Sequence, residues 1–241
     1  MSQQPEPVAK DIIVHTPKKV AEKIYNDLRR KNFRNILDIG ADSGELSNPW
    51  KRKKDTNIIA VDVFDDHIGN YKKGNFIHKD FMKTTRKDFP VVPDLILTNP
   101  PFQQNKETKN LIPHDWLTHC FKLWGKTIPV VMISGSWLLG NSRKRMDEFN
   151  DLNLTKTIKL HKNIFEGFAV EATVMYFNIR VSKSHEFLHD GPYKKPIQKF
   201  KSVSFNQDQM RWVEKNISSF SAEIKELLAK NYKDFPPNKR V

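Results

Sequence analysis

The segment Asp38-Ile39-Gly40-Ala41-Asp42-Ser43-Gly44-Glu45-Leu46 decides the fold. Its first two residues end the run from Arg34 to Ile39, which predicts a short buried strand, and the turn that follows precedes a predicted helix start. Glycine lets the backbone turn sharply and approach a ligand closely, because it has no Cβ. The spacing of Gly40 and Gly44 differs from G-x-G-x-x-G, so a nicotinamide dinucleotide site is disfavoured. Taken alone, such a turn also occurs in proteins that bind no ligand.

Further apolar runs follow at regular intervals along the chain. They cover Ile58 to Val63, Phe76 to His78, Asp94 to Thr98 and Ile128 to Ile133. The stretches between them are long enough for helices or crossovers. This rhythm predicts an α/β fold with a mostly parallel sheet and helices on both faces. Upstream, Thr16 is expected to cap a helix that has Pro17 in its first turn.

The pattern changes after residue 133. Two β-rich runs, Leu154 to Leu160 and Ala172 to Val181, are joined by residues 163–168, which predicts an antiparallel hairpin that closes the sheet. From Ser182 onward, lysines and prolines interrupt the apolar pattern until a final helical repeat of apolar residues. We therefore expect a catalytic domain over residues 1–182 and a basic C-terminal extension with a terminal helix over residues 183–241.

Composition narrows the class of protein. The chain has 241 residues, with 41 Lys and Arg against 28 Asp and Glu, so its net charge of +13 points to a polyanionic partner such as a nucleic acid. The single cysteine, Cys120, excludes an internal disulfide and a thiolate zinc cluster, and its helical surroundings predict a core position. No metal site is expected. The chain lacks an apolar run of membrane-spanning length and a signal-peptide profile, so we expect an intracellular protein without membrane contact.

Acidic residues stand at the ends of the second and third predicted strands. Asp62 ends the run that begins at Ile58, where a carboxylate can accept hydrogen bonds from both ribose hydroxyls of an adenosine. Its alternative role is to cap the next turn. Asp80 and Phe81 follow the third strand, where the carboxylate can accept from an exocyclic amine while the ring lies on a base. Together with the glycine turn, these residues favour an adenosine-containing cofactor.

The fourth strand, Asp94 to Thr98, leads into Asn99-Pro100-Pro101-Phe102. The nitrogen of an aryl amine or amide is a poor nucleophile because its lone pair is delocalised. The Asn99 side-chain oxygen and the Pro100 carbonyl can accept from its two N–H groups and turn the lone pair toward an electrophile. The prolines fix φ and offer no competing donor, and Phe102 can stack on the flat group. These residues predict catalysis at a planar amino nitrogen.

In this order, residues 15–182 resemble the amino-group methyltransferases that use S-adenosylmethionine, in particular the adenine-N6 enzymes of nucleic acids. The resemblance implies a Rossmann-like sheet of seven strands with a reversed hairpin. It also implies residues that bind the cofactor: Gly40 and Gly44 at its methionyl part together with Asp38 of the same motif, Asp62 at the ribose, Asp80 and Phe81 at the adenine, and Thr16 and Pro17 in the segment that covers it. Asn99, Pro100, Pro101 and Phe102 would then be catalytic. The chain departs from the family at Asp42, where a glycine is common, and at Pro49, which shortens the following helix.

Several functions share these features. The favoured one is a DNA adenine-N6 methyltransferase that extrudes its target base, and the nearest alternative is an RNA adenine-N6 enzyme. A protein-glutamine methyltransferase also has to methylate an amide nitrogen whose lone pair is delocalised, but the net charge of the chain disfavours a protein substrate. A non-catalytic subunit that binds nucleic acid is disfavoured by the intact tetrapeptide. The sequence leaves open a protein partner or a homodimer.

Overall fold

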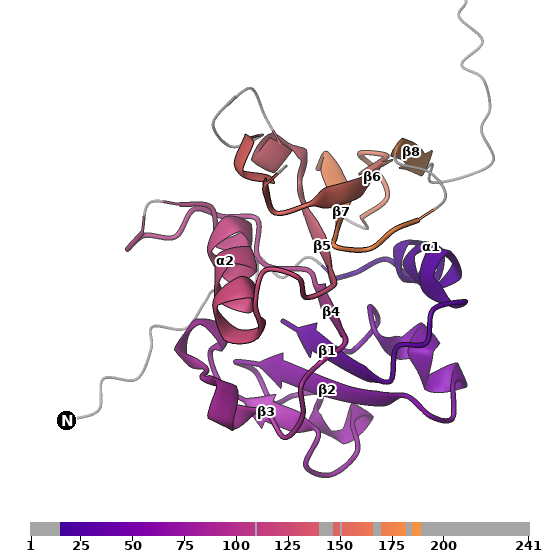
Figure 1. Cartoon of the computed structure of the whole chain (residues 1–241), viewed down its shortest axis with the longest axis vertical. Helices are drawn as coiled ribbons and strands as arrows, with labels where there is room; N and C mark the ends of the chain where they lie inside the picture. Colours follow the sequence, from indigo (N-terminus) through magenta and orange to yellow (C-terminus); the bar gives the residue numbers. More distant parts are fainter. Residues whose placement is uncertain are drawn as a thin grey trace, which may run out of the picture. The chain divides into compact units, whose positions relative to one another are not determined.

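One mixed sheet of eight strands, in the order β3-β2-β1-β4-β5-β7-β6-β8, organises the described part of the chain (Figure 1). The computed structural model describes residues 15–108, 110–139, 147–149, 151–165, 170–181 and 185–188. The chain divides into two compact units, residues 1–190 and 191–241, and all described residues belong to the first. The expected terminal helix lies outside the described residues.

The expected fold class is confirmed. The first five strands are mutually parallel: β1 (Asn35–Ile39), β2 (Asn57–Asp62), β3 (Phe76–His78), β4 (Leu95–Thr98) and β5 (Val130–Gly135). The hairpin of β6 (Leu154–Leu160) and β7 (Ala172–Phe177) inserts β7 antiparallel beside β5. The sheet has one strand more than the expected seven, because β8 (His185–Leu188) pairs in parallel with β6.

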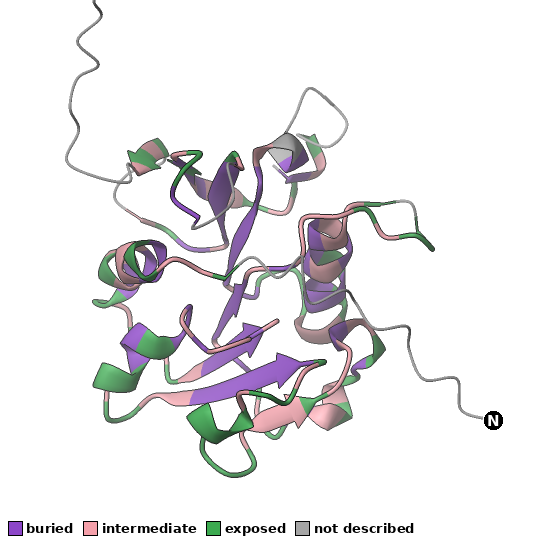
Figure 2. Cartoon of the chain, turned by 180° about the vertical axis from the view of Figure 1, so that it is seen from behind, coloured by how far each residue is buried: buried purple, intermediate pink, exposed green. Residues whose placement is uncertain are grey.

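Two helices cover opposite faces of the sheet. Helix α1 (Lys18–Leu28) and helix α2 (Ile112–Trp124) lie on either side of β4 (Figure 1). Alternate residues of β4 serve the two faces: Leu95 and Leu97 pack in the cluster of α1, and Ile96 packs in the cluster of α2. The central strands are buried along most of their length (Figure 2). No helix among the described residues is long and apolar enough to cross a membrane.

Cys120 is buried in α2, as expected. The expected cap of α1 is wrong. The N-cap residue is Pro17, with φ −63° and ψ 134°, and no side chain caps the helix. The Thr16 hydroxyl lies instead beside a residue 83 positions away, as described below. After β1, Pro49 stands near the start of a short 3-10 helix, η2 (Asn48–Arg52), in place of a full α-helix.

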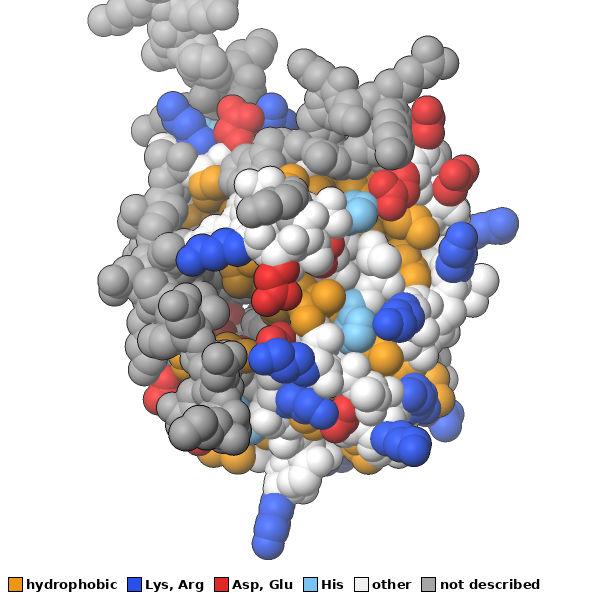
Figure 3. Space-filling view, turned by 90° about the vertical axis from the view of Figure 1, so that its left-hand side faces the viewer, with side chains coloured by type: hydrophobic (Ala, Val, Ile, Leu, Met, Phe, Trp, Pro, Cys, Tyr) orange, Lys and Arg blue, Asp and Glu red, His pale blue; other side chains and the backbone are white. Residues whose placement is uncertain are grey.

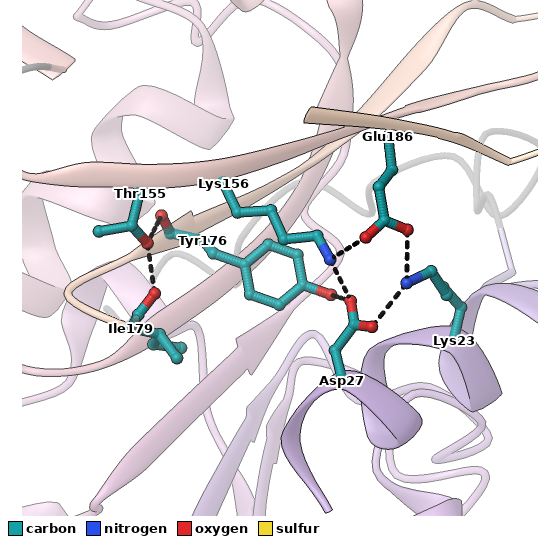
Figure 4. Close-up of polar contacts among 7 residues, drawn as sticks. All are labelled: Lys23, Asp27, Thr155, Lys156, Tyr176, Ile179 and Glu186. Atoms are coloured by element: carbon teal, nitrogen blue, oxygen red, sulfur yellow. Dashed lines mark hydrogen bonds and ion pairs between the residues drawn. The ribbon is translucent and has the colours of Figure 1, made fainter. Parts of the chain in front are cut away.

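An ion-pair network around the buried Lys156 ties α1 to the far end of the sheet (Figure 4). The ammonium of Lys156, with a side chain only 1% exposed, lies 2.7 Å from carboxylate oxygens of both Asp27 and Glu186. Lys23 bridges the same two carboxylates at 2.6 and 2.7 Å. The Tyr176 hydroxyl donates to Asp27 at 3.0 Å. Two cations and two anions thus neutralise each other where α1 meets β6, β7 and β8.

Replacing Lys156 should therefore destabilise the domain. We expect Lys156→Met to lower the free energy of unfolding by about 3 kcal/mol, because removing the buried ammonium leaves the two partly buried carboxylates undercompensated. Lys159→Met, at an exposed position of the same strand, should cost less than about 0.5 kcal/mol. Urea denaturation of the two variants measures the difference. Equal stability of both variants would show that the network contributes little.

Candidate functional site

The carboxyl ends of three neighbouring strands meet at one edge of the sheet. Strand β1 lies between β2 and β4, and Ile39 is paired with Val61 on one side and Thr98 on the other. Gly40, Asp62 and Asn99 each follow closely on these paired positions. Parallel α/β sheets bind ligands in the crevice outside the carboxyl ends of their strands. The structure thus brings the glycine turn, the second-strand carboxylate and the tetrapeptide together.

The glycine turn approaches the tetrapeptide closely. Gly40 has a φ of +65° and its N–H donates to the Val61 carbonyl at 2.9 Å. A Cβ at Gly40 would lie 3.0 Å from two ring atoms of Trp116 and 3.8 Å from the Asn99 carbonyl oxygen. Asp42, where related turns often have glycine, itself adopts a φ of +45°. The turn therefore keeps a left-handed bend without the middle glycine, since aspartate tolerates this conformation better than most residues.

The Asp62 carboxylate braces this turn. One of its oxygens accepts from the Asp42 N–H at 2.8 Å, and the other accepts from the Phe64 N–H at 3.0 Å. An ionised carboxylate has about four lone-pair sites, so each oxygen can accept a further hydrogen bond. Asp62 thus takes the turn-capping role that was its alternative, while retaining acceptors for two hydroxyl groups.

Asp38 lies beneath the turn with only 1% of its surface exposed. Its Oδ2 atom has no hydrogen-bond partner within the described part of the chain. Burial raises the pKa of Asp38 to about 7, hydrogen bonding from Ser47 opposes this rise, and the charges of Asp62 and Asp42 add to it. Three carboxylates around one turn create a site that suits a cationic ligand group.

Asp80 and Phe81 stand at the end of β3, as expected. The Asp80 carboxylate accepts from the Met82 N–H at 3.0 Å and caps the short 3-10 helix η4 (Phe81–Lys83). The Phe81 ring is buried, with its centroid 5.4 Å from that of Trp116 and 4.9 Å from that of His119. Phe81 therefore packs against α2, and Trp116 lies close both to the Phe81 ring and to Gly40.

The tetrapeptide is held from several directions. The Thr98 hydroxyl donates to the Ile39 carbonyl at 3.0 Å and joins the ends of β4 and β1. Asn99 is half-buried, and its Nδ2 donates to the Thr16 hydroxyl at 3.1 Å. Pro100 is buried, whereas Pro101 and Phe102 are half-buried. The Phe102 ring lies edge-on to Phe165, with centroids 6.2 Å apart.

The chain that follows the tetrapeptide is also anchored. Buried Asp115 of α2 accepts from Asn105 at 2.9 Å, from Asn110 at 3.0 Å and from the Thr108 hydroxyl. The loop between the tetrapeptide and α2 is therefore tied down at three points. Asp115, in the first turn of α2, thus accepts three hydrogen bonds from this loop.

Sequence reasoning missed three residues of this site. His15 contacts the Asp42 carboxylate, and His67 approaches the same carboxylate at 3.4 Å. Trp116 belongs to an apolar helical pattern that predicts a core position, and no feature of its spacing distinguishes it from core. Among the described residues, no group of three or more His, Cys, Asp or Glu side chains is arranged to hold a metal ion.

This fold, with a glycine turn and a carboxylate at the carboxyl ends of its strands, is similar to that of methyltransferases that use S-adenosylmethionine. Residues 19–123 match the family model of the methyltransferase small domain. The matched segment runs from α1 through β4 and includes most of α2. No curated protein matches the chain significantly in sequence.

Solved structures share the fold. A type I restriction-modification methyltransferase subunit from Streptococcus thermophilus matches with a TM-score of 0.55 and 13% identity, over 85% of this chain and 52% of that one. A modification subunit assigned to a type I restriction enzyme from Vibrio vulnificus YJ016 matches with a TM-score of 0.53 and 11% identity, over 89% and 54%. A class I S-adenosylmethionine-dependent methyltransferase from Listeria monocytogenes matches with a TM-score of 0.53 and 14% identity, over 82% of this chain and 68% of that one. The chain thus spans about half the length of the restriction-modification subunits.

The raised pKa of Asp38 has a measurable consequence. Its value of about 7 in the folded chain exceeds the ordinary 3.8, so the folded state binds the proton more tightly than the unfolded state. This contribution is full below about pH 4 and is lost as the pH rises through about 7. We expect the free energy of unfolding of the wild type, relative to Asp38→Asn, to fall between about pH 4 and pH 7. Denaturation of both proteins across this pH range measures the difference. If Asp38 had the ordinary pKa of a carboxylate, the difference in unfolding free energy would not change between about pH 4 and pH 7.

Proposed function

We propose that this protein methylates N6 of adenine in a nucleic acid, with DNA as the favoured substrate. The observation that carries the proposal is the proximity of Asn99 to the glycine turn, where the Asn99 carbonyl oxygen would lie 3.8 Å from a Cβ at Gly40. A methyl donor bound at the turn would then be within reach of an amino group held by the tetrapeptide. The proposal assigns the acceptor atom and the substrate class.

The residues at the turn suit S-adenosylmethionine. Asp62 would bind the ribose hydroxyls, and Gly40 and Gly44 would leave room for the methionyl part. Asp38, buried with an unpartnered oxygen in the described part of the chain, and Asp42 would favour the cofactor's positive charges. When bound, the cofactor supplies an electrophilic methyl group on a sulfonium centre. Asp80 and Phe81 would stand at its adenine, with Phe81 acting through the aromatic wall that it forms with Trp116.

The tetrapeptide would orient the acceptor nitrogen. The Asn99 Oδ1 and the Pro100 carbonyl accept from the two N–H groups of the adenine amine and draw its lone pair toward the donor. Both prolines lack an N–H and cannot compete for these acceptors. Phe102 stacks on the extruded base, and the proton leaves after methyl transfer, so no general base is needed beforehand.

Charge and fold support a nucleic-acid substrate. The net charge of the whole chain is +13, and a polyanion would release counterions on binding to such a surface. On the face shown in Figure 3, Lys and Arg side chains are spread among Asp and Glu rather than gathered in one stripe. The described part of this face therefore carries no continuous basic stripe, and the support from charge comes from the net charge of the whole chain. The likeness to restriction-modification subunits supports a DNA substrate through the fold alone.

A methylation assay with labelled cofactor tests the proposal. Matched DNA and RNA oligonucleotides are offered with a glutamine peptide, and the modified product is identified by mass. We expect N6-methyladenine in DNA. Label in RNA alone would replace the DNA assignment with the RNA alternative, label in the peptide alone would exclude nucleic acid as substrate, and no label in any substrate would contradict catalysis.

Asn99→Ala should separate catalysis from cofactor binding. We expect turnover to be abolished, because the acceptor oxygen is lost, while the affinity for S-adenosylmethionine stays within about tenfold of the wild type. Single-turnover assays and titration calorimetry measure the two quantities. Wild-type turnover in this variant would refute the catalytic assignment of Asn99.

Asp62→Ala should have the opposite signature. Loss of hydrogen bonds to a cofactor hydroxyl pair and to the turn should weaken the affinity for S-adenosylmethionine by at least about tenfold. Asp65→Ala, at an exposed position nearby, serves as the control and should bind normally. Titration calorimetry measures both affinities, with samples of the two variants that contain the same fraction of folded protein. Equal affinities of the two variants would remove Asp62 from the cofactor site.

A further inference from the structure

We propose that Thr16 is a positioning residue whose hydroxyl holds the Asn99 carboxamide in the orientation that presents its oxygen to the substrate. The inference rests on the proposed function, because it assigns a partner to the catalytic Asn99. It differs from the expectation that Thr16 covers the cofactor, since Thr16 would act through Asn99.

The direct observation is a hydrogen bond between residues 83 positions apart. The Asn99 Nδ2 donates to the Thr16 Oγ1 at 3.1 Å. Both side chains are half-buried, so water has limited access to compete for this contact. The hydroxyl is not used to cap α1, whose N-cap residue is Pro17 without a side-chain hydrogen bond. A threonine with the sequence signature of a helix cap therefore serves the tetrapeptide instead.

A carboxamide needs such a partner because its two ends are similar in size, yet the oxygen accepts hydrogen bonds and the NH2 group donates them. With the oxygen toward the substrate, Asn99 accepts from the amino group. Rotated by half a turn, it would place its own NH2 donors against the substrate's N–H donors. A hydroxyl that accepts from Nδ2 occupies the nitrogen end and leaves the oxygen end on the opposite side. Because a hydroxyl can donate as well as accept, the substrate's N–H groups select this rotation, and the Thr16 hydroxyl then holds the carboxamide in it by accepting from Nδ2.

The position of Thr16 is itself fixed on both sides. The preceding His15 contacts the Asp42 carboxylate in the glycine turn. The following Pro17 has a ring-restricted φ of −63° and leads into α1. The apolar face of α1 is buried in the core, and its Asp27 belongs to the ion-pair network. A continuous set of contacts thus links the core to the orientation of one amide.

Two substitutions at Thr16 separate positioning from simple packing. Thr16→Val keeps the shape and removes the hydroxyl, whereas Thr16→Ser keeps the hydroxyl. We expect Thr16→Val to lower kcat about ten- to hundredfold, the range for misorienting a reacting group, with cofactor affinity unchanged. Thr16→Ser should restore most of kcat. If Thr16 served only to bind the cofactor, affinity would fall and kcat at saturating cofactor would be preserved, which would overturn the inference.

A second background tests whether the effect passes through Asn99. In Asn99→Asp, either rotation of the side chain presents an acceptor oxygen, so orientation no longer matters. We expect Thr16→Val to reduce the residual kcat of Asn99→Asp by less than about threefold, which gives a strong coupling between the two positions. Equal losses in both backgrounds would show that Thr16 acts independently of Asn99.

The Asn99 side-chain amide provides a readout that does not depend on catalysis. Its two N–H signals can be assigned by NMR from their absence in Asn99→Asp. We expect Thr16→Val to shift one signal and Thr16→Ser to retain its position; identical spectra would exclude the hydrogen bond. If the wild type methylates no adenine, the proposed function fails and the inference fails with it. If the wild type is active and Thr16→Val keeps its kcat, only the inference fails.

Discussion

The parallel pairing of β1 with both β2 and β4 is the constraint on which the candidate site depends. Because Ile39 is in register with Val61 and Thr98, the residues that follow the three strands meet at one edge. The Thr98 hydroxyl, bonded to the Ile39 carbonyl, fixes the ends of two of these strands relative to each other. A slip of one residue would turn every side chain of a strand to the opposite face and separate Asn99 from the turn.

Contacts outside the site give this edge its geometry. The ion pairs of Lys156 with Asp27 and Glu186 hold α1 against β6 and β8, and α1 in turn sets the segment that contains Thr16. On the other face, α2 supplies Trp116 beside Gly40 and Asp115 beneath the loop that follows the tetrapeptide. Both faces of the sheet therefore contribute side chains to the candidate site, which couples the packing of the core to the placement of Asn99.

The differences between expectation and structure have a common cause. Thr16 has every local feature of a helix cap, yet its hydroxyl contacts Asn99, because the fold brings an amide donor to it. The sheet was expected to have seven strands, yet His185–Leu188 adds an eighth beside β6, whose ladder provides backbone partners that local sequence does not reveal. The helical pattern around Trp116 predicted burial, and only packing places its ring against Gly40.

The sequence by itself determined the α/β class, the hairpin and the residues that stand at strand ends, because these follow from hydrophobic periodicity and from residue types with restricted backbones. The chemistry proposed for Asn99-Pro100-Pro101-Phe102 was also readable from the sequence, because it lies in four consecutive residues. The tertiary structure alone decided which side chains meet across the edge: Asp62 with Asp42, Asn99 with Thr16, and Trp116 with Gly40. Those contacts join residues far apart in the chain, and their geometry depends on the register and packing of the whole sheet.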